Sequence, residues 1–278
     1  MKNFLLFYKS SSISGKISML MIALVFFVAV FGTAFSRHSA FVPSDSAFVP
    51  PNTEHLLGTD DLGIDLWAQI CEGAKLSLTI GIFSALLSGI AGSFIGIICG
   101  YYGGFFDKFV MRVSDILIAI PSLPLMIVMG VFFGAGIQNI IFVLAVFSWT
   151  GPARIARSKV ISLKTEKHVL VAESYGAGIF YLTFRHFLPE IFPVVMVSFI
   201  RLVNRGIVSE ASLSFLGLGD PTAKSWGLIL NHAISFKGIY FTDFWKWWLV
   251  SPFAAITLTV LAISFIARDA EKFLDVKL

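Results

Sequence analysis

A small group of polar residues interrupts the apolar stretch from 190 to 216. Arg201, Asn204, Arg205 and Glu210 lie there among aliphatic and aromatic neighbours. Arg201 and Arg205 are four residues apart, so on a helix they project from one face, with Asn204 beside them. Two positive charges on one face are suited to binding a carboxylate. The chemistry that this group suggests is therefore recognition of a charged molecule.

The same group also permits a purely structural interpretation. Charged residues at membrane depth are costly and usually face a polar cavity or an opposite charge. Arg205 would then pair with Glu210 or with Asp115, or Arg201 would extend its side chain toward the membrane interface. We keep both interpretations open and treat Arg201, Asn204, Arg205, Glu210 and Asp115 as candidate residues of a substrate path.

Motifs for catalysis or metal binding are absent from the sequence. It contains neither the G-x-x-x-x-G-K-[ST] loop that binds nucleotide phosphates nor the G-x-S-x-G turn of a serine nucleophile. The spacing of the five histidines does not match that of metal ligands; they are His38, His55, His168, His186 and His232. We expect no catalytic site and no metal site in this chain.

The composition places the chain in a lipid bilayer. Of its 278 residues, 56% are hydrophobic and 14% are charged, and the mean hydropathy is +0.84. A soluble domain carries about 25% charged residues, so these residues cannot form a surface that faces water. This excludes a cytosolic enzyme and a disordered scaffold, and two cysteines beside apolar stretches argue against a secreted disulfide domain. The net charge of +4 is attributed to cytoplasmic loops and not to nucleic-acid binding.

Six segments are long and apolar enough to cross a bilayer, which requires roughly 20 mainly apolar residues. The first has the basic start of a signal peptide, but its apolar run is long and no clean cleavage site follows, so we interpret it as an uncleaved anchor. The sequence thus predicts an all-α integral membrane protein with six transmembrane helices, at about 17–35, 77–100, 113–135, 139–160, 190–216 and 248–267.

Basic residues indicate which loops are cytoplasmic. Three lysines precede the first span without an acidic residue, whereas acidic residues outnumber basic ones in 36–76. The 151–189 loop is again rich in lysine and arginine. Both observations predict cytoplasmic N- and C-termini and place 36–76 and 217–247 outside. Within the first outer segment, 36–53 is rich in Ser and Pro and is predicted to be an irregular linker.

Gly92, Gly96, Gly100 and Gly104 recur every four residues and therefore line one face of a helix. Such small residues allow a neighbouring backbone to approach closely. We predict a packing seam here, formed either with another helix of the same chain or with a second copy.

The segment 162–189, between the fourth and fifth spans, is amphipathic and too polar to lie in the membrane. Gly176 and Gly178 interrupt it, and Leu188-Pro189 is expected to end it, since proline disfavours helix at the residue before it. We predict one or two short cytoplasmic helices in this loop.

Five stretches, taken together, resemble a known family. Their order and spacing, above all the G-T-D-x-x-G-x-D and S-F-L-G-L-G segments, are similar to those of the second, C-type permease subunit of peptide and nickel ABC importers. The resemblance extends from about residue 55 to the end of the chain. The stretches are HLLGTDDLGIDLWAQICEGAKLSL at 55–78, GYYGGFFDKFVMRVSDILIAIP at 100–121, WTGPARIARSKVISLKTEKHVLVAESYGAG at 149–178, FRHFLPEIFP at 184–193 and EASLSFLGLGDPTAKSWGLIL at 210–230.

This resemblance implies a type I importer with a MetI-like permease fold. Such a transporter joins two different permeases to two cytoplasmic ATPases, which bind ATP and Mg, and to an external substrate-binding protein. The present chain would then hold no cofactor, hydrolyse nothing, bind no nucleic acid and lie in membrane lipid. Its 162–189 loop would be the coupling loop through which ATP hydrolysis acts on the permease.

The same resemblance assigns roles within this loop. The family pattern is E-A-A, then three residues, then Gly, with a downstream Leu-Pro. Alignment on Arg185 and on Leu188 and Pro189 places the glycine of the pattern at Gly176 and the third residue of the triplet at Ala172. These residues are expected to take part in ATPase coupling.

The acidic position of the triplet departs from the family pattern, because Leu170 occupies it. Glu173 lies three residues further on, and on a helix residues 170 and 173 share nearly the same face. Either Glu173 supplies the displaced carboxylate or Leu170 enters the ATPase as an apolar knob. Both alternatives remain open at the level of sequence.

We expect residues 1–53 to provide a cytoplasmic N-terminus, the first transmembrane helix and an external linker, and residues 54–278 to form the permease domain. The predicted function is translocation of di- or oligopeptides across the cytoplasmic membrane of a prokaryote, by alternating access driven by partner ATPases. Uptake of nickel or a metal chelate is the alternative within transport. A membrane structural or assembly protein is the alternative from another class.

Overall fold

The structure is a computed structural model that describes residues 7–8, 11–134 and 136–275, so Lys2 and Lys9 of the predicted cytoplasmic N-terminus lie outside the described residues. The described residues form helices and loops, with one isolated bridge between Thr59 and Asp65. In chain order the helices are α2 (Ile13–Phe35), α3 (Leu66–Tyr102), α4 (Gly104–Ala119), α5 (Ser122–Phe133), α6 (Ile137–Ser148), α7 (Thr150–Leu163), α8 (Lys167–Ser174), α9 (Ile179–Leu182), the π-helical turn η1 (Thr183–Phe187), α10 (Leu188–Phe215), α11 (Trp226–Ser235), α12 (Trp245–Trp248) and α13 (Val250–Asp275).

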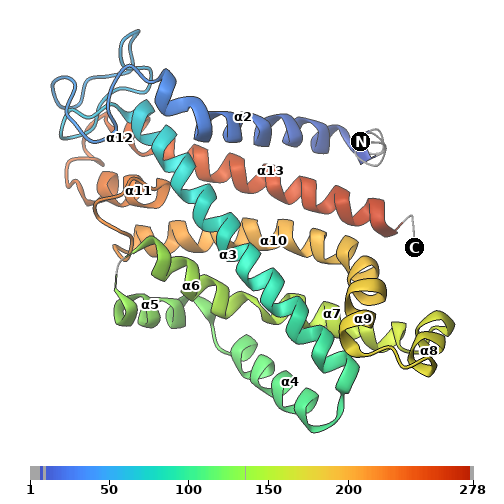
Figure 1. Ribbon diagram of the computed structural model, residues 1–278. Helices are drawn as coiled ribbons and strands as arrows, with labels where there is room; N and C mark the ends of the chain where they lie inside the picture. Colours follow the sequence, from blue (N-terminus) through green and yellow to red (C-terminus); the bar gives the residue numbers. More distant parts are fainter. Residues whose placement is uncertain (1–6, 9–10, 135, 276–278) are drawn as a thin grey trace.

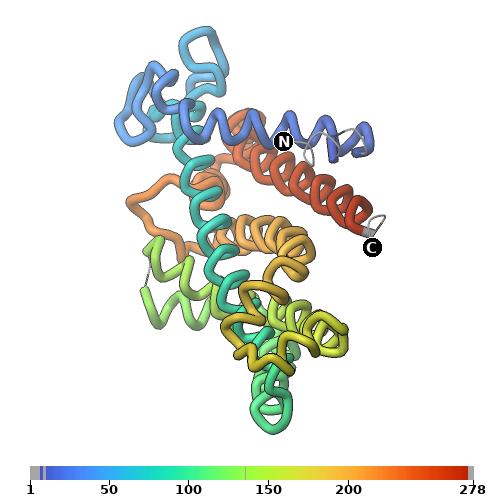
Figure 2. The backbone as a smooth tube through the Cα atoms, turned by 45° about the vertical axis from the view of Figure 1, so that its right-hand side comes forward, coloured from blue at the N-terminus to red at the C-terminus, as the bar shows by residue number. Residues whose placement is uncertain are grey.

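The first span, α2, runs beside the last, α13, in both views of the molecule (Figures 1 and 2). Ser12 caps α2 by accepting a hydrogen bond from the backbone N–H of Gly15 at 3.1 Å. The backbone N–H and the hydroxyl of Ser12 in turn donate to the Asp269 carboxylate at 2.9 and 2.7 Å. The start of the first span is thus fixed to the end of the last.

α3 is the central helix and contacts α2, α6, α7 and α10. It contains 37 residues and is therefore about 55 Å long, well beyond the hydrocarbon thickness of roughly 30 Å. The predicted span 77–100 therefore begins too late, because the helix already starts at Leu66. The helix starts after Asp65, whose carboxylate caps it by accepting from the backbone N–H of Ala68 at 2.7 Å.

The glycine row forms a packing seam, and its partner is α7 of the same chain. A Cβ atom on Gly96 would overlap the carbonyl oxygen of Ala153, and Cβ atoms on Gly92 and Gly100 would overlap α7 as well. The prediction is therefore confirmed for these three residues. It is wrong for Gly104, which begins α4 in open space because α3 has already ended.

The number of spans depends on two bent helix pairs. Four helical segments are long and apolar enough to cross a membrane by themselves, and the number rises to six if each bent pair counts as one span, as the sequence predicts. The pair α4 and α5 bends by 96°, and the pair α6 and α7 by 40°. The predicted span over 113–135 is therefore not one continuous helix. Ile120 is extended, as expected before Pro121, and the helix stops there.

Aromatic rings hold the linker 36–53 against the end of the molecule that carries α11 and α12 (Figure 1). The linker is irregular, as predicted. The ring of Phe48 stacks on Phe244 with 4.1 Å between centroids, and it also contacts Phe236 and Trp248 at 4.9 and 5.9 Å. The apolar side chain of Phe48 thus removes this part of the linker from solvent.

Two short helices, α8 and α9, lie in the loop between α7 and α10, as predicted. The expected stop at Leu188-Pro189 is wrong, because both residues begin α10, which continues to Phe215. Proline is tolerated in the first turn of a helix, where its missing N–H costs no hydrogen bond. The wide turn η1 leads into it, with the N–H of Leu188 donating to the carbonyl oxygen of Thr183.

The seam between α3 and α7 can be tested with two matched variants. Gly96→Ala should destabilise the protein by about 1–3 kcal/mol, because the new methyl group would push α7 away from α3. Gly89→Ala is the control, since a Cβ atom at Gly89 meets only Leu202, at 3.9 Å. In detergent, the temperature of thermal unfolding should be several degrees lower for Gly96→Ala than for the parent protein. For Gly89→Ala it should be unchanged or higher. Equal unfolding temperatures would contradict the seam.

Candidate functional site

The turn after α8 requires a glycine because of its backbone conformation. Gly176 has a φ of 86°. Its N–H donates to the carbonyl oxygen of Glu173 at 2.9 Å, and the N–H of Ala177 donates to that of Ala172 at 3.0 Å, which is the bond pair that closes a helix at a left-handed residue. A Cβ atom on Gly176 would meet no described atom within 4 Å. Backbone conformation, not crowding, therefore selects glycine here.

One face of α8 is attached to the rest of the protein. Val169 is fully buried in an apolar cluster with Val160 of α7 and Phe187 of the π-helical turn. Ala172 and Leu188, two of the predicted coupling residues, pack against the same cluster. A short helix of eight residues would be marginal alone, so this contact is what holds α8 in place.

The two alternatives for the ATPase contact differ in their surroundings. Leu170 is 49% exposed and points away from the protein. Glu173 is half-buried and interacts with the Tyr101 side chain at the end of α3. Leu170 and Glu173 therefore do not share one environment, although they are a single turn apart. Arg185 and Pro189, also predicted for coupling, are exposed.

Polar contacts join the approach to this loop to α3 and α4. The Lys164 ammonium donates to the carbonyl oxygen of Tyr101 at 2.6 Å and lies 5.2 Å from the centroid of its ring. Arg157 of α7 makes two parallel hydrogen bonds to the Asp107 carboxylate of α4, at 2.5 and 2.6 Å. Tyr101 is thus contacted from both sides of the loop, by Lys164 and by Glu173. A displacement of α8 would be passed directly to α3.

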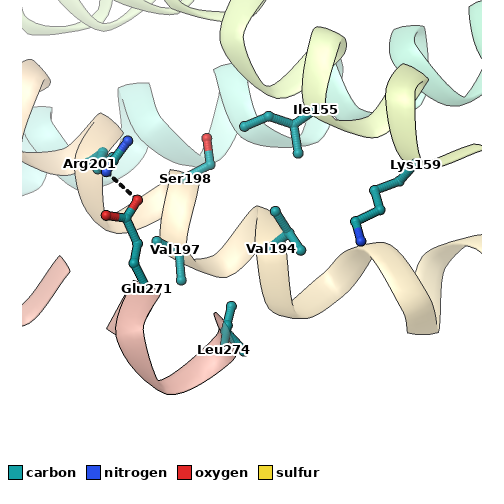
Figure 3. A pocket seen from close by; sticks show the side chains of 8 residues that line it. All are labelled: Ile155, Lys159, Val194, Val197, Ser198, Arg201, Glu271 and Leu274. Atoms are coloured by element: carbon teal, nitrogen blue, oxygen red, sulfur yellow. Dashed lines mark ion pairs between the residues drawn. The ribbon is translucent and has the colours of Figure 1, made fainter. Parts of the chain in front are cut away.

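Arg201 lies in a groove between α7, α10 and α13 (Figure 3). Its guanidinium forms an ion pair with Glu271 of α13. Lys159 reaches the other end of the groove from α7, and in the described part of the chain it has no carboxylate partner. The groove has a volume of about 470 Å³, and its remaining lining residues are Ile155, Val194, Val197, Ser198 and Leu274.

The predicted ion pairs of Arg205 are wrong. Asp115 pairs instead with Arg154 of α7, at 2.6 Å, and Glu210 is fully buried among serine hydroxyls. The side chain of Arg205 is exposed on α10. The spacing of Arg205 and Glu210 is the reason: five residues apart on a helix, they project in opposite directions.

Glu210 connects α3 and α10 through hydrogen bonds. Its carboxylate accepts from the Ser77 hydroxyl of α3 at 2.9 Å and from the Ser214 hydroxyl of α10 at 2.7 Å. It also lies close to Ser225, which caps α11 by accepting from the backbone N–H of Leu228 at 3.3 Å. These contacts place Glu210 in the packing between the two long helices, beside the start of α11.

Two partners of the polar residues on α10 were not predicted from the sequence. Asn204 donates to the Ser264 hydroxyl at 2.9 Å, and Arg201 pairs with Glu271. Ser264 and Glu271 are seven residues apart on one face of α13, so helical spacing in the last span is the signal that could have found them.

The five candidate residues of the substrate path do not form one cluster. Arg201 and Asn204 contact α13, Asp115 contacts α7, and Glu210 is buried. A role of these residues in substrate contact stays a prediction.

Comparison with known proteins identifies the family. Residues 92–277 match the model of the "Binding-protein-dependent transport system inner membrane component". The oligopeptide transport system permease protein OppC of Bacillus subtilis is 32% identical, over 100% of this chain and 90% of its own. The dipeptide transport system permease protein DppC of Bacillus subtilis is 34% identical, over 91% and 79%. The glutathione transport system permease protein GsiD of Pectobacterium atrosepticum is 37% identical, over 82% and 74%.

A solved structure is similar in fold. A crystal structure of the MetNI methionine ABC transporter in an inward-facing conformation superposes with a TM-score of 0.52 and 18% sequence identity, covering 74% of this chain and 97% of that chain. At this identity the likeness concerns the fold alone. The family match extends over more than half of the chain, and the relatives align along most of its length. This chain therefore belongs to the family of binding-protein-dependent transport system inner membrane components, the permeases of ABC importers, and has the MetI-like fold.

Proposed function

We propose that this permease imports small peptides as one half of a two-permease channel. Two separate ATPase subunits would bind ATP and Mg and supply the energy, and an extracytoplasmic binding protein would deliver the peptide. The observation that carries this proposal is α8, a short helix with an exposed Leu170 on one face and a buried Val169 on the other. Such a helix can receive a push from a partner and pass it to the long helices.

The relatives support a peptide as cargo. OppC, DppC and GsiD are named for oligopeptides, dipeptides and glutathione, all of which contain peptide linkages. None of the three protein names mentions a metal ion. A permease that accepts such related molecules would need few specific contacts and would leave most of the selection to the binding protein.

The proposed mechanism is alternating access. Closure of the ATPase pair would move α8, and the contacts of Tyr101 with Lys164 and Glu173 would carry the movement into α3. The bond between Arg157 and Asp107 would take α4 along. The path would open outward to accept the peptide and inward to release it. Such a cycle requires that the partners bind the two states with different affinity.

We infer the orientation from charge and from the position of the loops. The linker 36–53 and α8 lie at opposite ends of the molecule (Figure 1). Lysine and arginine are concentrated in the loop that contains α8, and cytoplasmic loops carry such an excess. The end with α8 would therefore be cytoplasmic, and the end with α11 and α12 would face outward.

Coupling can be tested at the turn after α8. Gly176→Val should leave the protein inserted but lower peptide uptake per ATP hydrolysed, because a β-branched residue at a φ of 86° costs roughly 1–2 kcal/mol or more and would misplace α8. Gly178→Val is the matched control, since Gly178 has an ordinary φ of −79° and open space around it. Uptake and ATP hydrolysis would be measured in proteoliposomes containing the full complex. Normal coupling in Gly176→Val would refute the role of this turn.

The identity of the ATPase contact can be tested by purification. Leu170→Asp should release the ATPase subunits from the purified complex, because it places a charge on the exposed apolar face of α8. Glu173→Gln should retain them, because Glu173 is engaged by Tyr101 of the same chain. Retention of the second permease in both variants would control for folding. The opposite pattern would assign the contact to Glu173.

The orientation can be tested by labelling introduced cysteines. A cysteine in place of Ser46 should react with an impermeant thiol reagent added outside, whereas one in place of Thr165 should react only after the membrane is opened. Both positions are exposed, so the expected difference comes from the membrane alone. The parent protein is the control, and its Cys71 and Cys99 are fully buried. Labelling of both introduced cysteines from outside would refute the orientation.

A further inference from the structure

One acidic residue of the G-T-D-x-x-G-x-D segment differs from its neighbours. Asp60 is fully engaged: its carboxylate accepts from the backbone N–H groups of Leu62 and Ile64 at 2.9 Å each and from the Gln69 amide at 2.7 Å. Asp61, next to it, has a buried Oδ1 atom without a hydrogen-bond partner in the described part of the chain. The fold therefore satisfies the carboxylate of Asp60 but leaves the Oδ1 atom of Asp61 without a hydrogen bond from the described residues.

A lysine in the loop between α10 and α11 also lacks an ion-pair partner among the described residues. Lys224 is half-buried, and within the described residues no carboxylate lies within ion-pair distance of its ammonium group. The loop that carries it is well fixed. Gly217, with a φ of 79°, closes α10, Asp220 accepts hydrogen bonds from the N–H and hydroxyl of Thr222 at 2.9 and 2.6 Å, and Ser225 caps α11.

Asp61 and Lys224 line two cavities that meet at one residue. The first, of about 300 Å³, is lined by Lys224 together with Gln69, Asn231 and His232. The second, of about 460 Å³, is lined by Asp61 together with His232, Ser235 and Lys237. His232 lines both cavities, so the carboxylate and the ammonium group belong to two neighbouring cavities. All of these residues lie at the end of the molecule assigned to the outside.

The two charges are partly desolvated but held apart. Burial lowers the pKa of Lys224, which Asp60 and Asp61 offset only in part. Burial, followed by the nearby Asp60 carboxylate, raises the pKa of Asp61, although His232 and Lys224 oppose this. Each charged form is thus less stable than in water, and each would gain from an opposite charge placed in the cavities. A molecule with a carboxylate and an ammonium group of its own would supply both.

We propose that these two neighbouring cavities bind the two charged ends of a peptide as it enters the permease, with the peptide carboxylate at Lys224 and its ammonium group at Asp61. The inference rests on the proposed function, because it takes the transported molecule to be a peptide and this end to face outward. It adds a contact site in the permease itself to the selection made by the binding protein. A molecule with only one of these end groups would neutralise only one of the two charges, Lys224 or Asp61.

The test compares uptake of three peptides by the complete transporter in proteoliposomes. The probes are trialanine, its C-terminal amide and its N-acetyl form, each supplied with the same binding protein. The variants are Lys224→Gln and Asp61→Asn. Lys246→Gln and Asp243→Asn are the matched controls, since Lys246 and Asp243 form an exposed ion pair at the same end of the molecule. For each peptide, the ratio of variant to parent uptake cancels the preference of the binding protein.

We expect Lys224→Gln to lower uptake of trialanine roughly tenfold, as for the loss of one hydrogen bond to a charged group, and to leave uptake of the amide at the parent rate. Asp61→Asn should lower uptake of trialanine by a similar factor and leave the N-acetyl form at the parent rate. Both controls should transport all three peptides at parent rates.

An equal loss for all three peptides would overturn the inference, because it would mean that this surface supports the fold or meets the binding protein. Unchanged uptake in both variants would overturn it as well. ATPase stimulation by the loaded binding protein verifies assembly in each variant. If the parent complex transports none of the three peptides, the proposed function itself is wrong and the inference falls with it.

Discussion

Glycines at positions 92, 96 and 100 let the backbones of α3 and α7 approach until the carbonyl groups of α7 lie directly against α3. Much of the structure at the end that carries α8 depends on this contact. Because α7 is held so closely, Arg157 reaches Asp107 of α4, and Lys164 reaches the carbonyl oxygen of Tyr101. The loop that begins at the end of α7 therefore starts from a fixed point on α3. Between helices in lipid, where apolar burial contributes little, such backbone packing is the main source of adhesion.

The opposite end is organised by buried polar groups. Glu210 accepts hydrogen bonds from serines of α3 and α10 and lies close to the cap of α11, and Trp226 of α11 donates to the carbonyl oxygen of Ile70 at 3.0 Å. A buried carboxylate is tolerated when donors surround it, and removing one of them leaves a costly unsatisfied group. The loops at this end are consequently fixed to the same two helices that the loop containing α8 contacts. The long helices α3 and α10 thus connect the two ends of the molecule.

Much of the architecture could be predicted from the sequence. Apolar length identified the spans, the four-residue glycine spacing identified the seam, and the family pattern singled out Gly176, whose φ of 86° favours glycine. The errors occurred where a local rule has two outcomes. Pro121 ends a helix and bends the chain by 96°, whereas Pro189 begins one. Before Pro121 the chain is extended at Ile120, because proline disfavours helix at the preceding residue, whereas the missing N–H of Pro189 is tolerated in the first turn of α10.

The sequence by itself determined that this chain lies in a membrane, that it is helical and to which family it belongs, because composition and motif order are properties of the chain alone. Only the tertiary structure decided which charges meet. Arg201 pairs with Glu271 from a distant span, and Arg205 pairs with neither predicted partner. It also separated Leu170, which is exposed, from Glu173, which Tyr101 engages. Partner choice depends on helix rotation and register, and these are set by packing between helices that lie far apart in the sequence.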